Sequence, residues 1–264
     1  MPNKPSVYGD LILRIFNNHY KKGVDAFAFG REEIETAAAD LKSRLPKNLG
    51  DVIYSFRYRK LFPKEIVDTE IDGKQWIILP AGRSKYRFKL TTLTQILPRP
   101  DLIATKIPDA TPQIIIAVEA LTDELALLAR VRYNRLIDIF LGITAYSVQN
   151  HLRTTVKGMG RIEIDEIYVG VNKTGQQFVL PVQAKGGKDK LAVIQTSQDL
   201  AYCAEKFPGL TPRAISAQFM QQNIIALFEL TLENDEVKVV EKRHYCLVSA
   251  KSITGDDLKN YANR

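Results

Sequence analysis

Four polar side chains lie in two strand-like runs between residues 161 and 190, where a buried sheet ordinarily carries apolar ones. The first run, RIEIDEIYVGV, contains Glu163 and Asp165, and the second, QFVLPVQAK, contains Gln183 and Lys185. Residues two apart in a strand share a face, so each pair projects to one side of its strand. Carboxylate and amide oxygens bind hard cations such as Mg²⁺, and a lysine beside them can orient or deprotonate a water. Together these groups suit the hydrolysis of a phosphodiester.

The turn between the two runs predicts which of these residues face each other. In NKTGQ, Gly175 stands where a three-residue hairpin loop needs a left-handed conformation. With this loop, Asp165 falls opposite Gln183 and Glu163 falls opposite Lys185, and directly opposed Cβ atoms lie about 5 Å apart. A shift of one residue would break this arrangement, so the register is a hypothesis for the structure to test.

An acid in one strand, a short hairpin and an acid-x-Lys element in the next strand form the signature of the PD-(D/E)xK nucleases, which this chain resembles. Asp165 matches the first acid, and the run QAK matches the second element, with Gln183 in the place of the usual acid and Lys185 as its lysine. Some restriction-type branches of the superfamily carry glutamine there. The resemblance covers about residues 114–220. It implies an α/β fold with a restriction-endonuclease-like core, in which helices flank a mixed central sheet.

The resemblance also implies a metal site. Mg²⁺ is the implied cofactor, with Mn²⁺ as a substitute, and Glu163 supplies the charge that Gln183 lacks. An upstream helix, through Glu119 or Glu124, provides the carboxylate that some members place on a helix. The implied catalytic residues are Asp165, Gln183, Lys185 and Glu163, and the implied metal ligands are Asp165, Glu163, Gln183 and Glu119.

The elements predicted around the hairpin follow the order of that superfamily's core. Residues 113–141 have helical periodicity, ITAYSVQNHLRTT alternates as a strand, and GMG precedes the hairpin as a turn. A helix is predicted in KDKLAVIQTSQDLAYCAEKF, and strands are predicted in PRAISAQFM and EVKVVEKRHYCLVSA. On that helix Gln198 and Tyr202 match the QxxxY element of several branches, so the resemblance implies a supporting part for both at the site.

Three helices and a hairpin are predicted before residue 96. Apolar residues recur at helical spacing in VYGDLILRIFNNHY, and FAFGREEIETAAADL contains a start signal and a second helix. A third helix follows Asn48, a suitable N-cap, and is expected to stop at Pro63. WIIL and YRFKL form two short strands around PAGRSK. This order resembles a winged helix-turn-helix, which implies a DNA-binding domain with its third helix in a groove and the hairpin as the wing.

The third helix and the wing carry the residues expected to contact DNA. The apolar stripe from Leu49 to Phe56 repeats at helical spacing, so Arg57 and Arg59 are expected to face outward. Arginine can contact phosphates or guanine edges, and a basic hairpin tip can follow the DNA backbone. A solvated basic face without a nucleic-acid partner is the alternative. The expected DNA-binding residues are Arg57, Arg59, Lys60, Arg83 and Lys85.

The distribution of charge favours a polyanionic partner for the first third of the chain. The net charge is +7 over 264 residues, and residues 1–95 hold 17 basic and 11 acidic side chains against 20 and 19 in residues 96–264. Cys203 and Cys246 lack a CxxC spacing and the histidines are scattered, so no Cys/His metal site is expected. Two cysteines do not make a disulfide framework, so we expect a location in the reducing cytoplasm. No apolar run approaches the roughly 18 residues of a transmembrane helix, so no membrane association is expected.

The proline-rich run LPRPDLIATKIPDATP, residues 97–112, predicts a linker between a winged-helix domain at 1–96 and a nuclease-like domain at 113–264. The expected function is Mg²⁺-dependent hydrolysis of double-stranded DNA by a sequence-specific type II restriction endonuclease. Cutting both strands of a symmetric site needs two active sites, so we expect a homodimer and a DNA methyltransferase encoded nearby. Two alternatives stay open: a structure-specific repair or recombination nuclease, and a DNA-binding regulator in which Gln183 marks lost activity.

Overall fold

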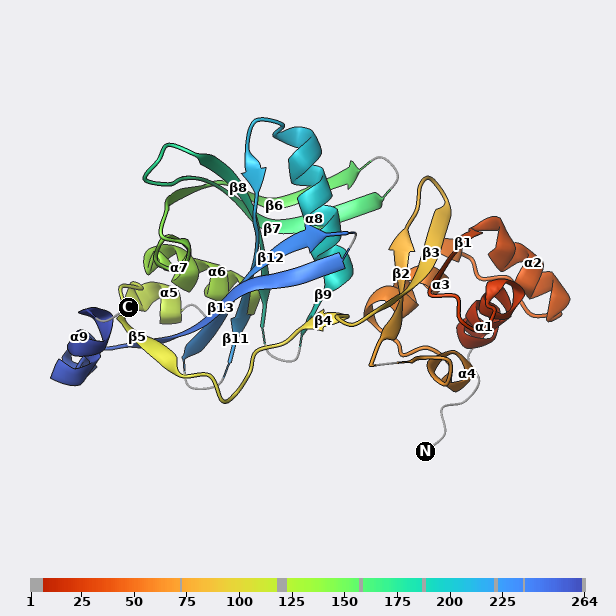
Figure 1. Ribbon diagram of the computed structural model, residues 1–264, viewed down its shortest axis with the longest axis horizontal. Coiled ribbons are helices and arrows are strands. Elements are labelled where there is room, and N and C mark those ends of the chain that lie inside the picture. Colours follow the sequence, from red (N-terminus) through yellow and green to blue (C-terminus); the bar gives the residue numbers. More distant parts are fainter. Residues whose placement is uncertain are drawn as a thin grey trace. The chain divides into compact units, whose positions relative to one another are not determined.

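The chain forms two compact units in the computed structural model (Figure 1). One unit comprises Met1–Thr94 with the short segments Thr154–Ile162 and Ala192–Ile194, and the other comprises Gln95–Arg153, Glu163–Leu191 and Gln195–Arg264. Each unit has a buried hydrophobic cluster of its own. The structure describes residues 7–71, 73–117, 123–156, 159–186, 189–220, 223–234 and 236–262.

The unit built on the first part of the chain combines helices with a three-stranded antiparallel sheet. Its sheet has the order β1-β3-β2, so the last strand lies between the other two. The predicted helices and the predicted hairpin are confirmed. The elements are α1 Val7–His19, β1 Ala26–Gly30, α2 Glu32–Asp40, α3 Leu49–Tyr58, α4 Lys64–Val67, β2 Gln75–Pro80 and β3 Lys85–Thr91.

In this unit the structure confirms one prediction made from local sequence signals and corrects two others. The Asn48 side-chain oxygen accepts the Gly50 N–H at 3.0 Å, as expected of the N-cap of α3. Helix α3 ends at Tyr58, and Pro63 stands at the start of α4, where a missing N–H costs nothing. The run AFAFG, expected to lead into the second helix, forms β1 because it pairs with β3 along its whole length.

Aromatic rings make up much of this unit's core. The Phe16 ring of α1 lies 5.2 Å from Trp76 of β2 and 5.3 Å from Phe88 of β3, both nearly perpendicular. Phe27 of β1 adds a third edge contact at 5.4 Å. Edge-to-face pairs of this kind are favoured by the ring quadrupoles, so Phe16 ties the first helix to all three strands.

The larger unit contains a mixed sheet with helices on both faces, as the sequence predicts. The sheet has eight strands in the order β5-β13-β12-β11-β8-β7-β6, with β10 added beside β8. Strands β8 and β11 are parallel, as are β13 and β5, whereas β7 and β8 are antiparallel. The remaining elements of the chain are β4 Gln95–Ile96, β5 Ala104–Pro108, α5 Gln113–Ala117, α6 Asp123–Tyr133, α7 Leu136–Leu141, β6 Thr144–Val156, β7 Gly160–Val171, β8 Gln177–Lys185, β9 Leu191–Ala192, α8 Val193–Lys206, β10 Thr211–Pro212, β11 Ala214–Phe219, β12 Ile224–Glu233, β13 Glu236–Val248 and α9 Gly255–Ala262.

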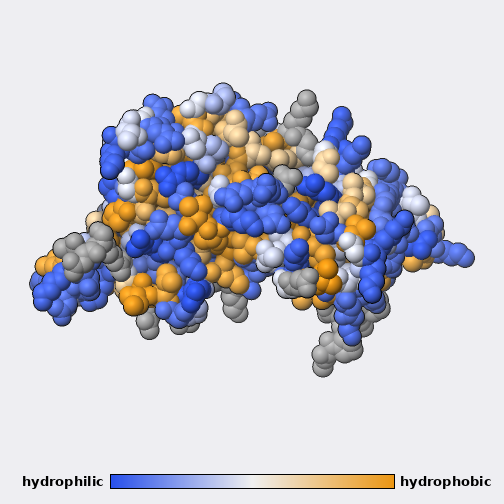
Figure 2. Space-filling model, in the orientation of Figure 1, coloured by the Kyte–Doolittle hydropathy of each residue, from blue (hydrophilic) through white to orange (hydrophobic). Residues whose placement is uncertain are grey.

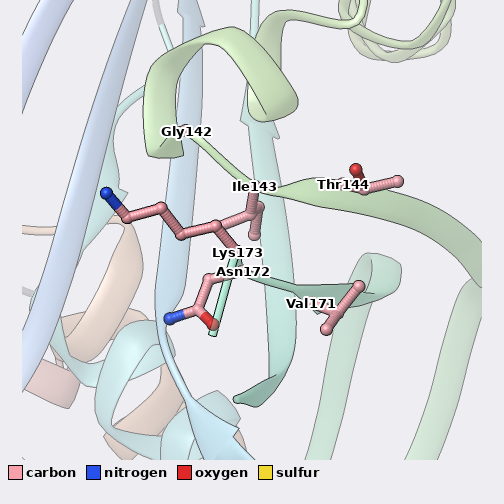
Figure 3. Close-up of a pocket in the computed structure, with 6 residues that line it drawn as sticks. All are labelled: Gly142, Ile143, Thr144, Val171, Asn172 and Lys173. Carbon is pink, nitrogen blue, oxygen red and sulfur yellow. The ribbon is translucent and has the colours of Figure 1, made fainter. Parts of the chain in front are cut away.

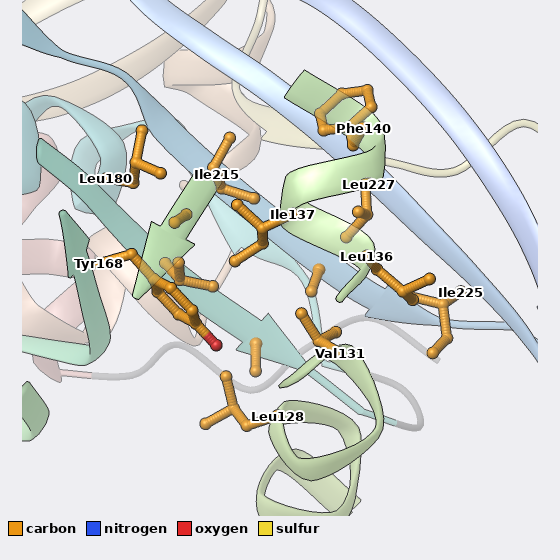
Figure 4. Packing of buried hydrophobic residues seen from close by; sticks show 14 of the residues in the cluster. Leu128, Val131, Leu136, Ile137, Phe140, Tyr168, Leu180, Ile215, Ile225 and Leu227 are labelled. Atoms are coloured by element: carbon orange, nitrogen blue, oxygen red, sulfur yellow. The ribbon is translucent and has the colours of Figure 1, made fainter. Parts of the chain in front are cut away.

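Alternation along β8 distributes its side chains between two helical layers. Leu180 and Val182 point into the cluster formed with α6 and α7, which Figure 4 shows around Leu128, Ile137 and Phe140. Gln183 points to the opposite face, where its amide contacts α8. The two faces of one strand therefore serve different purposes, since one builds the core and the other carries the polar residues.

The run predicted as a linker contains a strand. Residues 104–108 form β5, which pairs in parallel with His244–Val248 of β13 at the edge of the sheet. Prolines suit such a place, because an edge strand leaves one row of N–H groups outside the ladder. The run IIALFELTLE, to which the sequence assigned no element, forms β12 between β11 and β13. The sheet is therefore wider than the predicted core.

The surface mixes polar and apolar side chains. Figure 2 shows hydrophilic residues spread over the visible face with apolar patches among them. The exposed apolar residues include Val240 of β13 and Tyr146 of β6. Among the described residues, no helix is long and apolar enough to cross a membrane.

Candidate active site

The hairpin of β7 and β8 has the predicted register. Val171 faces Gln177 next to the turn, and the pairing continues to Glu166 opposite Val182. Gly175 adopts the left-handed conformation expected of the loop, with φ of +84°. Beyond this stretch side chains contact the opposite strand, and the predicted facing of Asp165 with Gln183 and of Glu163 with Lys185 stays a prediction. The Ala184 N–H donates to Asp165 Oδ2 at 2.8 Å, and the Gln183 amide donates to the Glu163 carbonyl at 2.8 Å.

Asp165 is a buried carboxylate beside a lysine. Burial raises the pKa of Asp165 above its ordinary value, and the nearby carboxylates of Glu124 and Glu163 raise it further. The Lys185 ammonium and the Ala184 N–H act in the opposite direction but do not cancel the effect of burial. A cation bound at this place would favour the ionised form of Asp165, so the carboxylate is suited to a positively charged ligand.

Lys185 lies at the end of β8 with its side chain largely buried. Its Nζ is 3.3 Å from Oε1 of Glu124, which lies in the first turn of α6. Of the two helix carboxylates considered from the sequence, Glu124 contacts Lys185. Glu119 lies outside the described residues. The contact brings one charged group from the helix layer to the lysine of the QAK run.

The side chain of Gln183 is held between a strand and a helix. Its Nε2 donates to the Glu163 carbonyl and also, at 2.9 Å, to Oδ2 of Asp199 on α8. Both Gln183 and Asp199 are buried, with exposures of 3% and 2%. Burial raises the pKa of the Asp199 carboxyl well above its usual range, although the Gln183 hydrogen bond opposes that shift.

Asp199 is the residue that sequence reasoning missed. It lies in QDLAY between the two residues matched to the QxxxY element, and its neighbour Gln198 is also buried. Tyr202 is half-buried, and burial raises its pKa. The signal in the sequence was an acid inside an otherwise uncharged stretch of an amphipathic helix. Its contact with β8 depends on which face of the helix meets the sheet.

The remaining predicted ligand, Glu163, has a different environment. Its side chain is 48% exposed, and its carboxylate accepts from Arg153 of β6 at 2.8 Å. Glu163 therefore stands at the rim, where its backbone carbonyl holds Gln183 and its side chain is already paired. Its carboxylate remains close enough to Asp165 to influence the pKa of that group.

A second ion pair holds α6 against the other face of β7. The Glu166 carboxylate is fully buried and lies 2.6 Å from Nη2 of Arg132 on α6. The Ser147 hydroxyl of β6 donates to the same oxygen. Arg132 lies in the last turn of α6 and Glu124 in its first, so the two ion pairs hold opposite ends of this helix.

The oxygen atoms at the site are of the kind that binds a hard cation. Asp165 and Glu124 offer carboxylate oxygens and Gln183 offers an amide oxygen, which are the atoms that Mg²⁺ binds in proteins. Within the described ranges, no group of three or more His, Cys, Asp and Glu side chains is positioned to hold a metal by itself. A cation here would therefore use the amide oxygen and water, which Mg²⁺ commonly retains.

A shallow hollow elsewhere in this unit does not contribute to the site. It has a volume of about 330 Å³ and is lined by the end of β7 with the first residues of the turn, Val171–Lys173, and by Gly142–Thr144 at the start of β6, as Figure 3 shows. None of its lining residues carries a carboxylate. The hollow lies at the turn end of the hairpin, whereas Asp165 and Lys185 lie at the other end.

Among the residues expected to contact DNA, Arg57 is partly buried and the others are exposed. Arg57 does not face outward: its Nε donates to the Ile78 carbonyl at 2.9 Å, and its guanidinium lies over the Tyr86 ring. Burial lowers the pKa of Arg57. Arg57 is on the apolar stripe because it follows Ile53 by four residues, one helical turn.

The other expected DNA-binding residues are exposed. The Arg59 guanidinium lies 4.8 Å from the centroid of the Tyr54 ring, and Lys60 Nζ lies 5.4 Å from that of Tyr8. The tyrosine rings hold these cations at the end of α3 without burying them. Arg83 and Lys85 are exposed around the turn between β2 and β3.

The fold and the site define a mixed α/β protein with a polar site at one end of a central hairpin. The scan against protein-family models found no family that matches the chain, and neither curated proteins nor solved structures gave a match.

Proposed function

We propose that this protein is a Mg²⁺-dependent endonuclease that cuts double-stranded DNA at a specific sequence, as type II restriction enzymes do. The observation that carries the proposal is the convergence of Asp165, Gln183 and Lys185 at one end of the β7–β8 hairpin, with Glu124 on the lysine. The resemblance to PD-(D/E)xK nucleases rests on the same three residues. The mixed sheet with helices on both faces is compatible with that superfamily's core.

The first part of the chain supports DNA as the substrate. Its order of helices and strands, with the sheet order β1-β3-β2, is compatible with a winged helix-turn-helix. Arg59 and Lys60 at the end of α3 and Arg83 at the β2–β3 turn supply exposed positive charge. These residues are proposed to contact phosphates, which would position the duplex without reading its bases.

The proposed reaction assigns a separate task to each residue. Asp165 and Gln183, with Glu124 or Glu163 at the rim, would hold Mg²⁺. A Mg²⁺ ion bound there would lower the pKa of a water and stabilise charge on a phosphoryl oxygen. Lys185 orients the attacking water or stabilises the negative charge that develops on the phosphoryl group. Glu124 holds the Lys185 ammonium in place by its contact at 3.3 Å.

The remaining parts of the proposal follow from the reaction on a duplex. Cutting both strands at a symmetric site requires two copies of the site, so the working enzyme is proposed to be a homodimer. A host that makes such an enzyme must protect its own DNA, which calls for a methyltransferase of the same specificity encoded nearby. Mn²⁺ is expected to replace Mg²⁺, because both prefer oxygen ligands.

The test is cleavage of unmethylated phage and plasmid DNAs by the purified protein with Mg²⁺ and with EDTA. Lys185→Ala is compared with Lys173→Ala, which removes an exposed lysine at the hairpin turn. Discrete Mg²⁺-dependent fragments that persist in Lys173→Ala and disappear in Lys185→Ala are expected. Unchanged cutting by Lys185→Ala would refute the site.

Other outcomes of this test select the alternatives. Cleavage of junctions or flaps in place of intact duplex would assign a structure-specific repair or recombination nuclease. A retained gel shift without cutting of any substrate would assign a DNA-binding protein without nuclease activity.

A further inference from the structure

The Gln183 amide uses both of its N–H groups inside the protein. One is donated to the Glu163 carbonyl at 2.8 Å and the other to Asp199 Oδ2 at 2.9 Å. A primary amide has two N–H donors and one oxygen, so the position of both hydrogens fixes the position of the oxygen. Oε1 must then face away from Glu163 and Asp199.

The opposite orientation of the amide is unfavourable. Rotation by half a turn would place Oε1 against a carbonyl and a carboxylate, which are both acceptors, in a place where Gln183 is only 3% exposed. Buried acceptors that face each other lose their hydrogen bonds and repel, which destabilises that orientation. Asp199 therefore restricts Gln183 to one of two otherwise similar orientations.

We propose that Asp199 is a positioning residue of the active site, which fixes the Gln183 amide so that its oxygen is presented to the metal. This inference rests on the proposed function, since it assigns a purpose to the orientation of a proposed ligand. Asp199 itself does not contact the metal. Its place is behind Gln183, on α8, and it acts through the amide alone.

The same contact accounts for glutamine at a position where an acid is usual. A carboxylate at residue 183 would face Asp199 at hydrogen-bond distance in a buried setting, and two such carboxylates cannot both be ionised without a large cost. Glutamine removes that repulsion and gains a hydrogen bond to a carboxylate. The acidic group absent from residue 183 therefore lies on α8, at Asp199.

The first experiment compares Asp199→Leu with Asp199→Asn. Leucine cannot accept a hydrogen bond, whereas the asparagine oxygen can take the place of Oδ2, so the conservative variant is expected to restore the contact. Mn²⁺ binding to the full chain without DNA, followed by electron paramagnetic resonance, is expected to weaken about 10- to 100-fold in Asp199→Leu and to stay within about threefold in Asp199→Asn. Equal Mn²⁺ affinity in folded Asp199→Leu and wild type would overturn the proposal.

A second experiment exchanges the two groups and stays informative if Asp199→Leu does not fold. Gln183→Glu alone places two carboxylates in contact and is expected to lower the melting temperature in EDTA. When Gln183→Glu is combined with Asp199→Asn, the hydrogen bond can form again with donor and acceptor reversed. Part of the loss in melting temperature should then be regained. Additive effects of the two substitutions in this double-mutant cycle would show that the residues are not coupled and would contradict the proposal.

A third readout separates this inference from the proposed function. The side-chain NH₂ resonances of Gln183 should be shifted and protected from exchange in the wild type and in Asp199→Asn, but not in Asp199→Leu. A wild-type protein that shows this signature but binds no Mn²⁺ and cuts no DNA would refute the proposed function and leave Asp199 as a purely structural partner. Absence of the signature in a protein that does cut DNA would refute the positioning role alone.

Discussion

The guanidinium of Arg132 lies 2.6 Å from the carboxylate of Glu166, and the two side chains differ sharply in exposure, at 45% and 0%. A buried carboxylate without a partner is costly, so the arginine compensates a charge that β7 places inside the core. Arg132 and Glu124 lie two turns apart on α6, about 12 Å along the helix axis. The Arg132–Glu166 and Lys185–Glu124 ion pairs therefore hold α6 at two separate places.

Arg132→Met is expected to lower the free energy of unfolding by about 2–3 kcal/mol, because Glu166 keeps only its hydrogen bond from Ser147. Urea denaturation measures the loss. The double variant Arg132→Met with Glu166→Gln should regain part of it, since the glutamine carries no charge. A double variant less stable than Arg132→Met would contradict the view that the unpaired charge is the cause.

Asp165→Asn is expected to abolish cleavage and to stabilise the metal-free protein at neutral pH. The folded pKa of Asp165 is raised, mainly by burial, so the unfolded chain loses this proton at a lower pH than the folded one. Between the two pKa values the folded state binds more protons, and stability contributed by this group falls as the pH rises. Asparagine cannot ionise, and its oxygen can still accept the Ala184 N–H.

The melting temperatures of Asp165→Asn and wild type, measured in EDTA across pH, check this sign. The advantage of the variant should be greatest at pH 7 and should shrink below about pH 4, where the aspartate of the unfolded chain is also protonated. An advantage that grows as the pH falls would mean that the Asp165 carboxylate stabilises the fold when ionised.

Arg59→Ala combined with Lys60→Ala is expected to weaken DNA binding without affecting folding. Both side chains are exposed and rest on tyrosine rings, so their removal leaves the core intact. Loss of two phosphate contacts should reduce the slope of log affinity against log salt by about 1–2. Fluorescence anisotropy at several salt concentrations measures this slope, and an unaltered slope would remove the end of α3 from the DNA interface.

Arg57→Ala is the matched comparison, and it should lower stability without changing the salt dependence of DNA binding. It removes a hydrogen bond to the Ile78 carbonyl and the contact with Tyr86, so a loss of about 1–2 kcal/mol in stability is expected. Its salt slope for DNA binding should equal that of the wild type. A reduced slope with unchanged stability would place Arg57 at the DNA after all.

The hairpin was predictable in detail because turn chemistry fixes its register. Gly175 determined the loop, and the loop determined that Glu166 faces Val182, which the structure confirms. The capped start of α3 was predictable for the same reason, since Asn48 acts on its own neighbours in sequence. Local signals of this kind do not depend on how distant elements pack.

The contacts that sequence reasoning missed all depend on packing. Asp199 reaches Gln183 only because one face of α8 meets the sheet, and the QxxxY pattern drew attention to its neighbours. Arg57 was expected outside although its spacing from Ile53 places it beside the buried stripe. Strand β5 was hidden among prolines because its partner, β13, is far away in the sequence.

The pairing of β5 with β13 has a consequence for how the protein is made on the ribosome. Ala104 pairs with His244, so a strand that is synthesised early must wait for one of the last strands before its edge of the sheet is complete. Contacts between such distant residues slow folding, because a long loop must close first. Until then β12 lacks the neighbour that covers it, and the nascent chain exposes an apolar edge open to chaperones or to misassembly.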